Sequence, residues 1–158
     1  MRIIRLVTGA ALAVAAGCAI RPGTEDNSLA PGAEWTATIV PTTVSAIHGT
    51  ITFVRTDPPN QTRVIFSLVD GTANAVRPWH VHFGVCGNDD IIVGKPSIYP
   101  PLVMSGSGSL NAVAQLPVEL DPRTQYVVHL HDSPTAMKTV IACAPLVRRT
   151  ETTVATSH

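Results

Sequence analysis

Four of the six histidines in this chain form two matching pairs, His80 with His82 and His129 with His131, and each pair is separated by a single residue. On a β-strand, residues two apart point to the same face, so each pair would present two imidazoles about 7 Å apart. If the two strands approach each other, up to four ring nitrogens converge. Neutral imidazole is a preferred ligand of copper and zinc. The two pairs therefore predict a transition-metal site with all four histidines as candidate ligands.

A structural role for these histidines stays open, because imidazoles in a sheet are also commonly hydrogen-bonded within the fold or exposed. His48 stands alone in a strand-like stretch and His158 is the last residue, so neither is expected to be a ligand. After the first pair, Asp89, Asp90 and Met104 could add an oxygen or thioether ligand. A lone acid or methionine in a loop is, however, more commonly solvated or packed.

The elements that must hold these side chains are strands. From Trp35 onward, short stretches rich in Val, Ile and Thr alternate with turn-forming stretches, and 13 prolines oppose long helices. We expect an all-β fold, a Greek-key β-sandwich or flattened barrel of about seven to eight antiparallel strands. The stretch from Gly87 to Ser109 has no clear strand, and a loop of that length commonly covers a functional site. The expected strands lie near Trp35 to Val40, Ala46 to Val54, Arg63 to Val69, Pro78 to Gly84, Leu110 to Leu116, Gln125 to His131 and Thr139 to Val147.

The beginning of the chain is typical of an exported protein. Two arginines among the first residues precede an apolar run from Leu6 to Ala16, which is too short for a membrane-spanning helix and predicts a signal peptide. Small residues then lead into Cys18, and this stretch resembles a bacterial lipobox, in which the cysteine is lipidated and begins the mature chain. Ala15 replaces the usual leucine. Ala19 after the cysteine is similar to the pattern that sorts lipoproteins to the outer membrane of Gram-negative bacteria.

These features predict the organisation of the chain. Residues 1–17 are expected to be a signal peptide, 18–33 the lipidated cysteine and a flexible tether, 34–149 one β domain, and 150–158 a disordered tail. The predicted location is the cell envelope, lipid-anchored at the outer membrane and facing the periplasm or the exterior. The formal net charge is zero and no run of Lys or Arg occurs, so no nucleic-acid partner is expected. A metal ion and the lipid anchor are the expected partners, and the oligomeric state stays open.

The chain has three cysteines, and one of them, Cys18, is the expected lipidation site. Lipidation of Cys18 would leave Cys86 and Cys143 as an even pair in a compartment that permits disulfides. We expect these two to be bonded. The loop that they would close is long, so the bond could stabilise the fold by about 4 kcal/mol.

The residues around these histidines and cysteines resemble the copper-binding half of the Cu/Zn superoxide dismutase superfamily. The matching stretches are residues 79–86 (WHVHFGVC), 126–131 (YVVHLH) and 141–143 (IAC), within a resemblance that spans roughly residues 45 to 147. The resemblance implies a superoxide dismutase-like sandwich with copper bound by His80, His82 and one histidine of the later pair. Similarity to small bacterial dismutase-like domains makes His131 the first choice for that third ligand, with His129 the alternative or a fourth ligand.

The chain also departs from this family. No histidine lies between Cys86 and His129, where the family has its bridging and zinc-binding histidines, so copper is expected and zinc is not. Val140 takes the position of the arginine that attracts superoxide, and 11 residues separate His131 from Cys143, so the charged loop is missing. Fast dismutation depends on steering an anion and relaying protons. The sequence has neither the arginine that would steer the anion nor the charged loop that would assist it.

We therefore expect an envelope copper-binding lipoprotein that sequesters or delivers copper on a superoxide dismutase-like fold, with no catalytic residue assigned. One alternative is a copper-only enzyme of the superoxide dismutase type. The other is a metal-free structural or interaction domain, because a fold alone does not determine a function.

Overall fold

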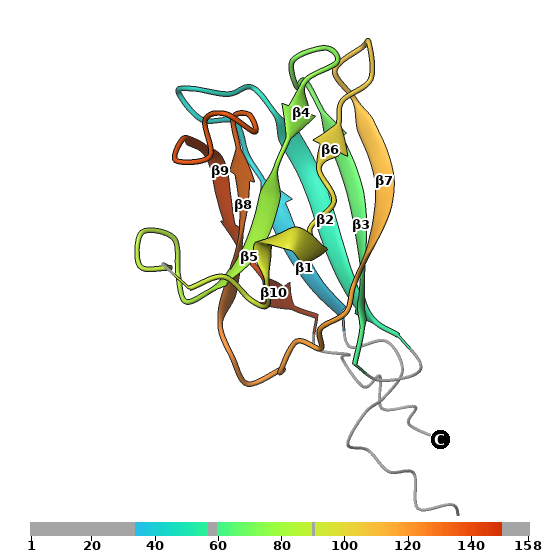
Figure 1. Ribbon diagram of the computed structural model, residues 1–158, viewed down its shortest axis with the longest axis vertical. Helices are drawn as coiled ribbons and strands as arrows, with labels where there is room; N and C mark the ends of the chain where they lie inside the picture. The colour runs from blue at the N-terminus through green and yellow to red at the C-terminus, as the bar shows by residue number, and fades with distance from the viewer. Residues whose placement is uncertain (1–33, 57–59, 90, 150–158) are drawn as a thin grey trace, which may run out of the picture.

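The computed structural model describes residues 34–56, 60–89 and 91–149 (Figure 1). The expected signal peptide, the lipidation site Cys18, the tether, Asp90 and the 150–158 tail lie outside the described residues, so they stay predictions. None of the described residues belongs to a helix of the length and apolarity needed to cross a membrane.

Strands dominate the described part of the chain, as the alternating Val, Ile and Thr stretches predict. Seven of them are long and begin or end within about two residues of the expected positions. Three further strands have only two residues each, and one short 3-10 helix, η1 (Pro96–Ile98), lies in the long loop. The strands are β1 (Glu34–Ile39), β2 (His48–Arg55), β3 (Thr62–Val69), β4 (Val76–Arg77), β5 (Trp79–Phe83), β6 (Leu102–Val103), β7 (Leu110–Leu116), β8 (Tyr126–His131), β9 (Val140–Pro145) and β10 (Val147–Arg148).

Two antiparallel sheets form the body of the molecule. The larger has the order β10-β1-β2-β3-β7, and the smaller has the order β5-β8-β9. β3 pairs with β7 and β5 pairs with β8, so the chain crosses from one sheet to the other and back between these strands. Non-consecutive neighbours of this kind are what a Greek-key sandwich requires. The all-β antiparallel fold class is confirmed.

Short strands connect the two sheets on both sides. Only Leu146 separates β9 from β10, so the chain passes directly from the smaller sheet to the edge of the larger one. On the other side, β4 runs into β5 and pairs with β6, which lies against β7. Figure 1 shows the β4 and β6 pair between β5 and the β3–β7 side of the larger sheet. With these connections at both edges, the sandwich approaches a flattened barrel.

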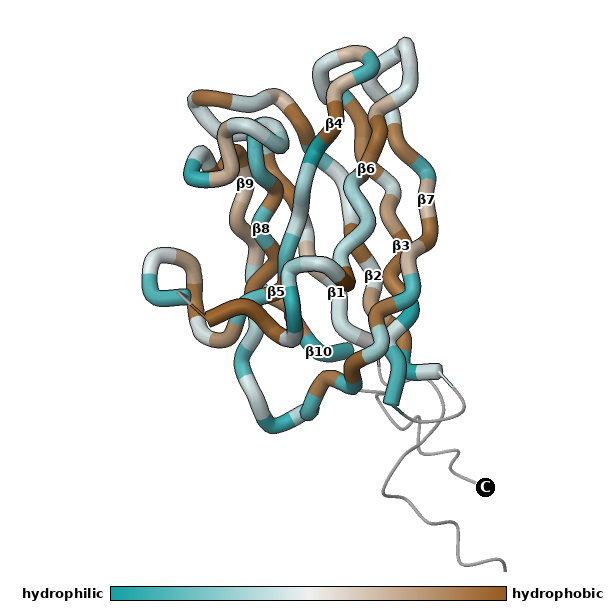
Figure 2. The backbone as a smooth tube through the Cα atoms, in the orientation of Figure 1, coloured by the Kyte–Doolittle hydropathy of each residue, from teal (hydrophilic) through white to brown (hydrophobic). Residues whose placement is uncertain are grey.

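The apolar core lies between the sheets. On β3, buried and more exposed residues alternate along the strand, which is the pattern of a sheet with one face in the core and one toward water. Phe66 of β3 meets Trp79 of β5 edge to face, with ring centroids 4.8 Å apart, and this contact joins the two sheets. Figure 2 shows hydrophobic residues running along the strands of both sheets.

The smaller sheet is covered on both faces. All six residues of β8 are buried, although they alternate between the two faces of the sheet. Val128 and Leu130 belong to the apolar core, so Val127, His129 and His131 point away from it. Because these outward residues are also buried, loops must cover the outer face of this sheet. That covered face carries the histidines.

Candidate metal site

Both histidine pairs lie on the outer face of the smaller sheet. Trp79 and Val81 of β5 point into the core. Because side chains alternate along a strand, His80 and His82 point to the opposite face. His80 lies directly across from His129 in the β5–β8 register. The four histidines are only 5–7% exposed. The expected approach of the two strands is therefore confirmed, and it brings four imidazoles into one buried layer.

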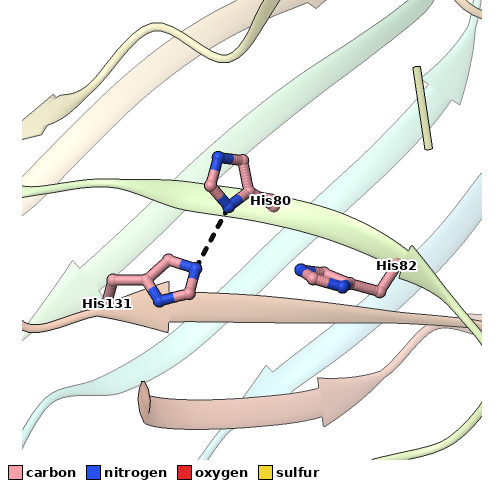
Figure 3. Close-up of side chains that lie close together, drawn as sticks. All are labelled: His80, His82 and His131. Carbon is pink, nitrogen blue, oxygen red and sulfur yellow. Dashed lines mark hydrogen bonds between the residues drawn. The ribbon is translucent and has the colours of Figure 1, made fainter. Parts of the chain in front are cut away.

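Three of the four rings converge on a common point. The possible ligand atoms of His80, His82 and His131 all lie within 4.8 Å of one another. Nδ1 of His80 is 3.1 Å from Nε2 of His131, the contact that joins β5 to β8 in Figure 3. The ring of His82 comes from the same strand as His80 and faces this contact (Figure 3). This cluster of three imidazoles could hold one metal ion.

Burial keeps two of these imidazoles uncharged at neutral pH. Desolvation, followed by the nearby His131, His82 and His129, lowers the pKa of His80 from 6.5 to about 4. Desolvation is also the main cause that lowers the pKa of His131, and the neighbouring His129 and His82 contribute. Metal binding requires neutral imidazole with a free lone pair. The donor set therefore fits a transition-metal ion such as copper.

The orientation of His82 is fixed by the loop that follows β5. Nδ1 of His82 lies 2.6 Å from the backbone carbonyl oxygen of Asp89. Because a carbonyl can only accept, Nδ1 carries the proton and donates, so in the neutral ring Nε2 is the nitrogen with a lone pair. A hydrogen bond of this kind commonly orients a metal-binding histidine and sets its tautomer.

His129 has a different partner. Its Nε2 lies 2.6 Å from Oδ2 of Asp89, and both side chains are about nine-tenths buried, at 9% and 11% exposed. The ring of His129 lies over that of His82, with centroids 4.3 Å apart and planes 32° from parallel. His129 is therefore in the same layer but is not one of the three converging residues.

A tight turn brings Asp89 back over the sheet. Gly84 directly follows β5 with a φ of +106°, and a Cβ there would lie 2.3 Å from the carbonyl oxygen of Asn88, so only glycine fits. Val85 and Asn88 then exchange two backbone hydrogen bonds, which closes the turn. Cys86 lies within the turn and is bonded to Cys143 of β9, as the cysteine count predicts. The disulfide thus fastens the turn to the sheet on which the histidines lie.

The rest of the long loop covers the free edge of β5. The backbone N–H of Phe83 donates to Ile91 (2.9 Å), and the backbone N–H of Val93 donates to Val81 (2.8 Å). Further along, the ring of Tyr99 packs edge-on against His80 with centroids 5.2 Å apart. The stretch that sequence patterns singled out as a cover for a site does lie beside the histidines.

An ion pair holds the other end of the site. The guanidinium of buried Arg77 donates from Nη1 to the carboxylate of Asp132 at 2.7 Å and also to its backbone carbonyl. Asp132 directly follows His131, and the backbone N–H of His131 donates to Pro78 at 2.8 Å. These contacts fix the strand end that carries His131. Nothing in the spacing of Arg77 indicated this role.

The other residues considered from the sequence lie elsewhere. His48 is on β2 in the larger sheet, where its Nδ1 lies 3.1 Å from the carbonyl oxygen of Ala46. Met104 is buried in the apolar core against Gly71. Asp89 does lie at the site, but its carboxylate contacts His129 and is not part of the three-histidine cluster. Val140, which takes the position of the arginine that attracts superoxide in the resembling family, pairs directly with His131 in the β8–β9 register.

Comparison with known proteins identifies the fold. No protein-family model matches the chain, and no curated protein sequence matches it. Among solved structures, three variants of superoxide dismutase 5 from Candida albicans are similar in structure, with TM-scores of 0.54–0.55 and 13–16% sequence identity. The similarity covers 82% of this chain and 98–99% of theirs. The chain therefore has a superoxide dismutase-like fold.

Proposed function

We propose that this chain is a copper-binding lipoprotein of the bacterial cell envelope that sequesters or delivers copper. The observation that carries the proposal is the buried cluster of His80, His82 and His131, whose ligand atoms lie within 4.8 Å of one another. Three imidazoles suit copper, and the cluster contains neither the thiolates nor the carboxylates that many other metals favour.

Each histidine would contribute one nitrogen. His80 would bind through Nδ1 and His131 through Nε2, the two atoms that already face each other at 3.1 Å. His82 would bind through Nε2, because its Nδ1 is engaged with the carbonyl oxygen of Asp89. Bound copper would supply a centre that can take up or release one electron.

The envelope location rests on the sequence. The apolar run before Cys18 and the small residues that lead into it support export and lipidation of that cysteine. A disulfide between Cys86 and Cys143 suits an oxidising compartment outside the cytoplasm. Mass spectrometry of the mature protein from bacterial membranes tests this part: a diacylated or triacylated Cys18 at the N-terminus is expected, and an unmodified Cys18 would contradict it.

Copper titration of the purified protein tests the site. Because a ligand of the folded state stabilises it by mass action, copper should raise the melting temperature of the wild-type protein. The variants His80→Ala, His82→Ala and His131→Ala should lose most of this rise, since each removes one of three ligands.

The control is His48→Ala, which removes a histidine from the other sheet and should leave the copper-dependent rise unchanged. If the three site variants bind copper as tightly as the wild type, these histidines do not form the metal site and are structural or surface residues. A wild-type protein that binds no copper would favour the metal-free structural or interaction domain.

A copper-only superoxide dismutase is the second candidate, because the similar solved structures are superoxide dismutases. Against high activity stands Val140, an apolar residue 37% exposed beside His131, where a cation would be needed to attract superoxide. We expect the copper-loaded protein to turn over superoxide far below the diffusion limit of about 10⁸–10⁹ M⁻¹s⁻¹. A rate near that limit that falls steeply with added salt would favour the enzyme.

A further inference from the structure

We propose that Asp89 is a positioning residue that keeps His129 out of the ligand set of the metal and so makes the site a three-histidine rather than a four-histidine centre. The inference rests on the proposed copper function for its consequence, but the contact on which it depends lies in the protein itself. His129 lies opposite His80 and stacks on His82, so distance alone does not explain why it stands outside the cluster.

The carboxylate of Asp89 explains this position. It accepts a hydrogen bond from Nε2 of His129 at 2.6 Å, a short distance typical of a charge-assisted bond in a dry environment. Nδ1 of His129 is buried, and within the described part of the chain it has no hydrogen-bond partner. The bond to Asp89 is therefore the polar contact that determines where this ring points.

The same residue acts on a second histidine through its backbone. The carbonyl oxygen of Asp89 accepts from Nδ1 of His82 at 2.6 Å. Substitution of the side chain leaves this carbonyl in place, so variants at position 89 can separate the two contacts. The turn fastened by the Cys86–Cys143 disulfide supports both.

Release of His129 would add a fourth imidazole within reach of the metal. Its ring centroid is 4.3 Å from that of His82 and 6.0 Å from that of His131, so a change of side-chain rotamer suffices to bring a nitrogen toward the cluster. Cu²⁺ favours four ligands near one plane, whereas Cu⁺ has a filled d shell and no such preference. By holding His129, Asp89 would disfavour Cu²⁺ relative to Cu⁺.

The variants Asp89→Ala, Asp89→Asn and His129→Ala test the proposal by electron paramagnetic resonance of the Cu²⁺-loaded protein. Wild type and His129→Ala should both show hyperfine coupling to three nitrogens. Asp89→Ala should show four and bind Cu²⁺ about tenfold more tightly relative to Cu⁺, a shift of about 1.4 kcal/mol. Asp89→Asn should resemble the wild type, because its amide oxygen still accepts from Nε2. The double variant Asp89→Ala/His129→Ala should return to three nitrogens.

Nitrogen NMR of the metal-free protein tests the contact without copper. His129 should appear as the Nε2–H tautomer with a slowly exchanging proton, and Asp89→Ala should remove that signal. Asp70→Asn is the matched control, because Asp70 and His48 form a pair 3.6 Å apart on the surface of the other sheet.

Four outcomes separate the ideas. If the wild-type protein binds no copper but shows the Nε2–H signal, the proposed function is wrong, and the hydrogen bond between His129 and Asp89 is still supported. Absence of that signal overturns the role of Asp89 whether or not copper binds. Loss of one nitrogen in His129→Ala would overturn it as well, because His129 would then already be a ligand. Asp89→Ala with an unchanged copper spectrum would do the same.

Discussion

On the larger sheet, the outward residues of β3 and β7 face water: Val113 of β7, for example, is 54% exposed. On the smaller sheet, the outward residues of β8 are covered, and Val127 is 0% exposed. Both faces of the smaller sheet are therefore dry, although only one of them belongs to the apolar core.

The difference arises from the loops. The stretch after β5 returns over its own sheet, is fastened by the Cys86–Cys143 disulfide and pairs with the edge of β5 through residues 91–93. This cover takes water away from the imidazoles beneath it, which lowers the pKa of His80 and leaves its nitrogen available to a metal. A second dry layer outside the core is what turns a strand with two histidines into a candidate site.

The largest effect is expected in the core between the sheets. Phe66 is 1% exposed and contacts Trp79, so Phe66→Ala should lower the free energy of unfolding by about 3–5 kcal/mol. Urea denaturation measures this loss. Ser67→Ala, on the adjacent outward position of the same strand, should change stability by less than about 0.5 kcal/mol. A similar small loss for both variants would mean that the two sheets are not joined through this contact.

Removal of the disulfide should come next. The bond joins residues 57 apart in sequence, and its replacement in Cys86→Ser/Cys143→Ser should lower the free energy of unfolding by about 2–4 kcal/mol. Chemical denaturation without reductant measures the difference. The variant should also expose the covered outer face, so hydrogen exchange at β8 amides should accelerate more than at β3 amides. Equal acceleration in both strands would show that the disulfide supports the whole fold and not the covered face in particular.

Acid should weaken the covered face specifically. In the unfolded chain His80 has its ordinary pKa of 6.5, and in the folded chain burial lowers this pKa to about 4. Between these values the unfolded state binds the proton and the folded state does not. The contribution of neutral His80 to the free energy of unfolding is therefore fully present above pH 6.5. It is lost as the pH falls toward 4, and the loss is at most about 3 kcal/mol.

Melting of the metal-free protein across this pH range tests the expectation. In His80→Ala the melting temperature should fall less between pH 6.5 and pH 4 than it does in the wild type. At pH 7.5 the melting temperatures of the two proteins should differ little. His48→Ala, at the half-buried position on the larger sheet, should keep the wild-type dependence. If His80→Ala has the same acid dependence as the wild type, His80 is not the group that titrates.

The smallest effects compare the two outer faces directly. Val127→Thr places a hydroxyl in the covered layer and should cost about 1–3 kcal/mol, because the buried hydroxyl has lost its water. Val113→Thr makes the same change on the exposed face and should stay within about 0.5 kcal/mol. Equal small losses, measured by urea denaturation, would mean that water reaches β8 and that the outer face of the smaller sheet is not dry.

Much of the strand pattern could be predicted from local sequence. Alternation on β3, the turn residues between strands and the two one-residue histidine spacings each depend on the geometry of a single strand. The short strands β4, β6 and β10 were not expected, because a two-residue strand has no periodicity of its own. β10 arises only where the chain, predicted as one strand to Val147, leaves the smaller sheet at Leu146 and joins β1.

By itself the sequence determined that His80 with His82, and His129 with His131, would share faces of strands, and that Cys86 and Cys143 were available to each other. It could not distinguish His129 from His131, because a period of two places both on one face. The tertiary structure places the two side chains differently, since the turn after Gly84 brings the carboxylate of Asp89 to His129 and leaves His131 facing His80. A contact between residues 40 positions apart depends on how the loop folds over the sheet, and no local pattern contains it.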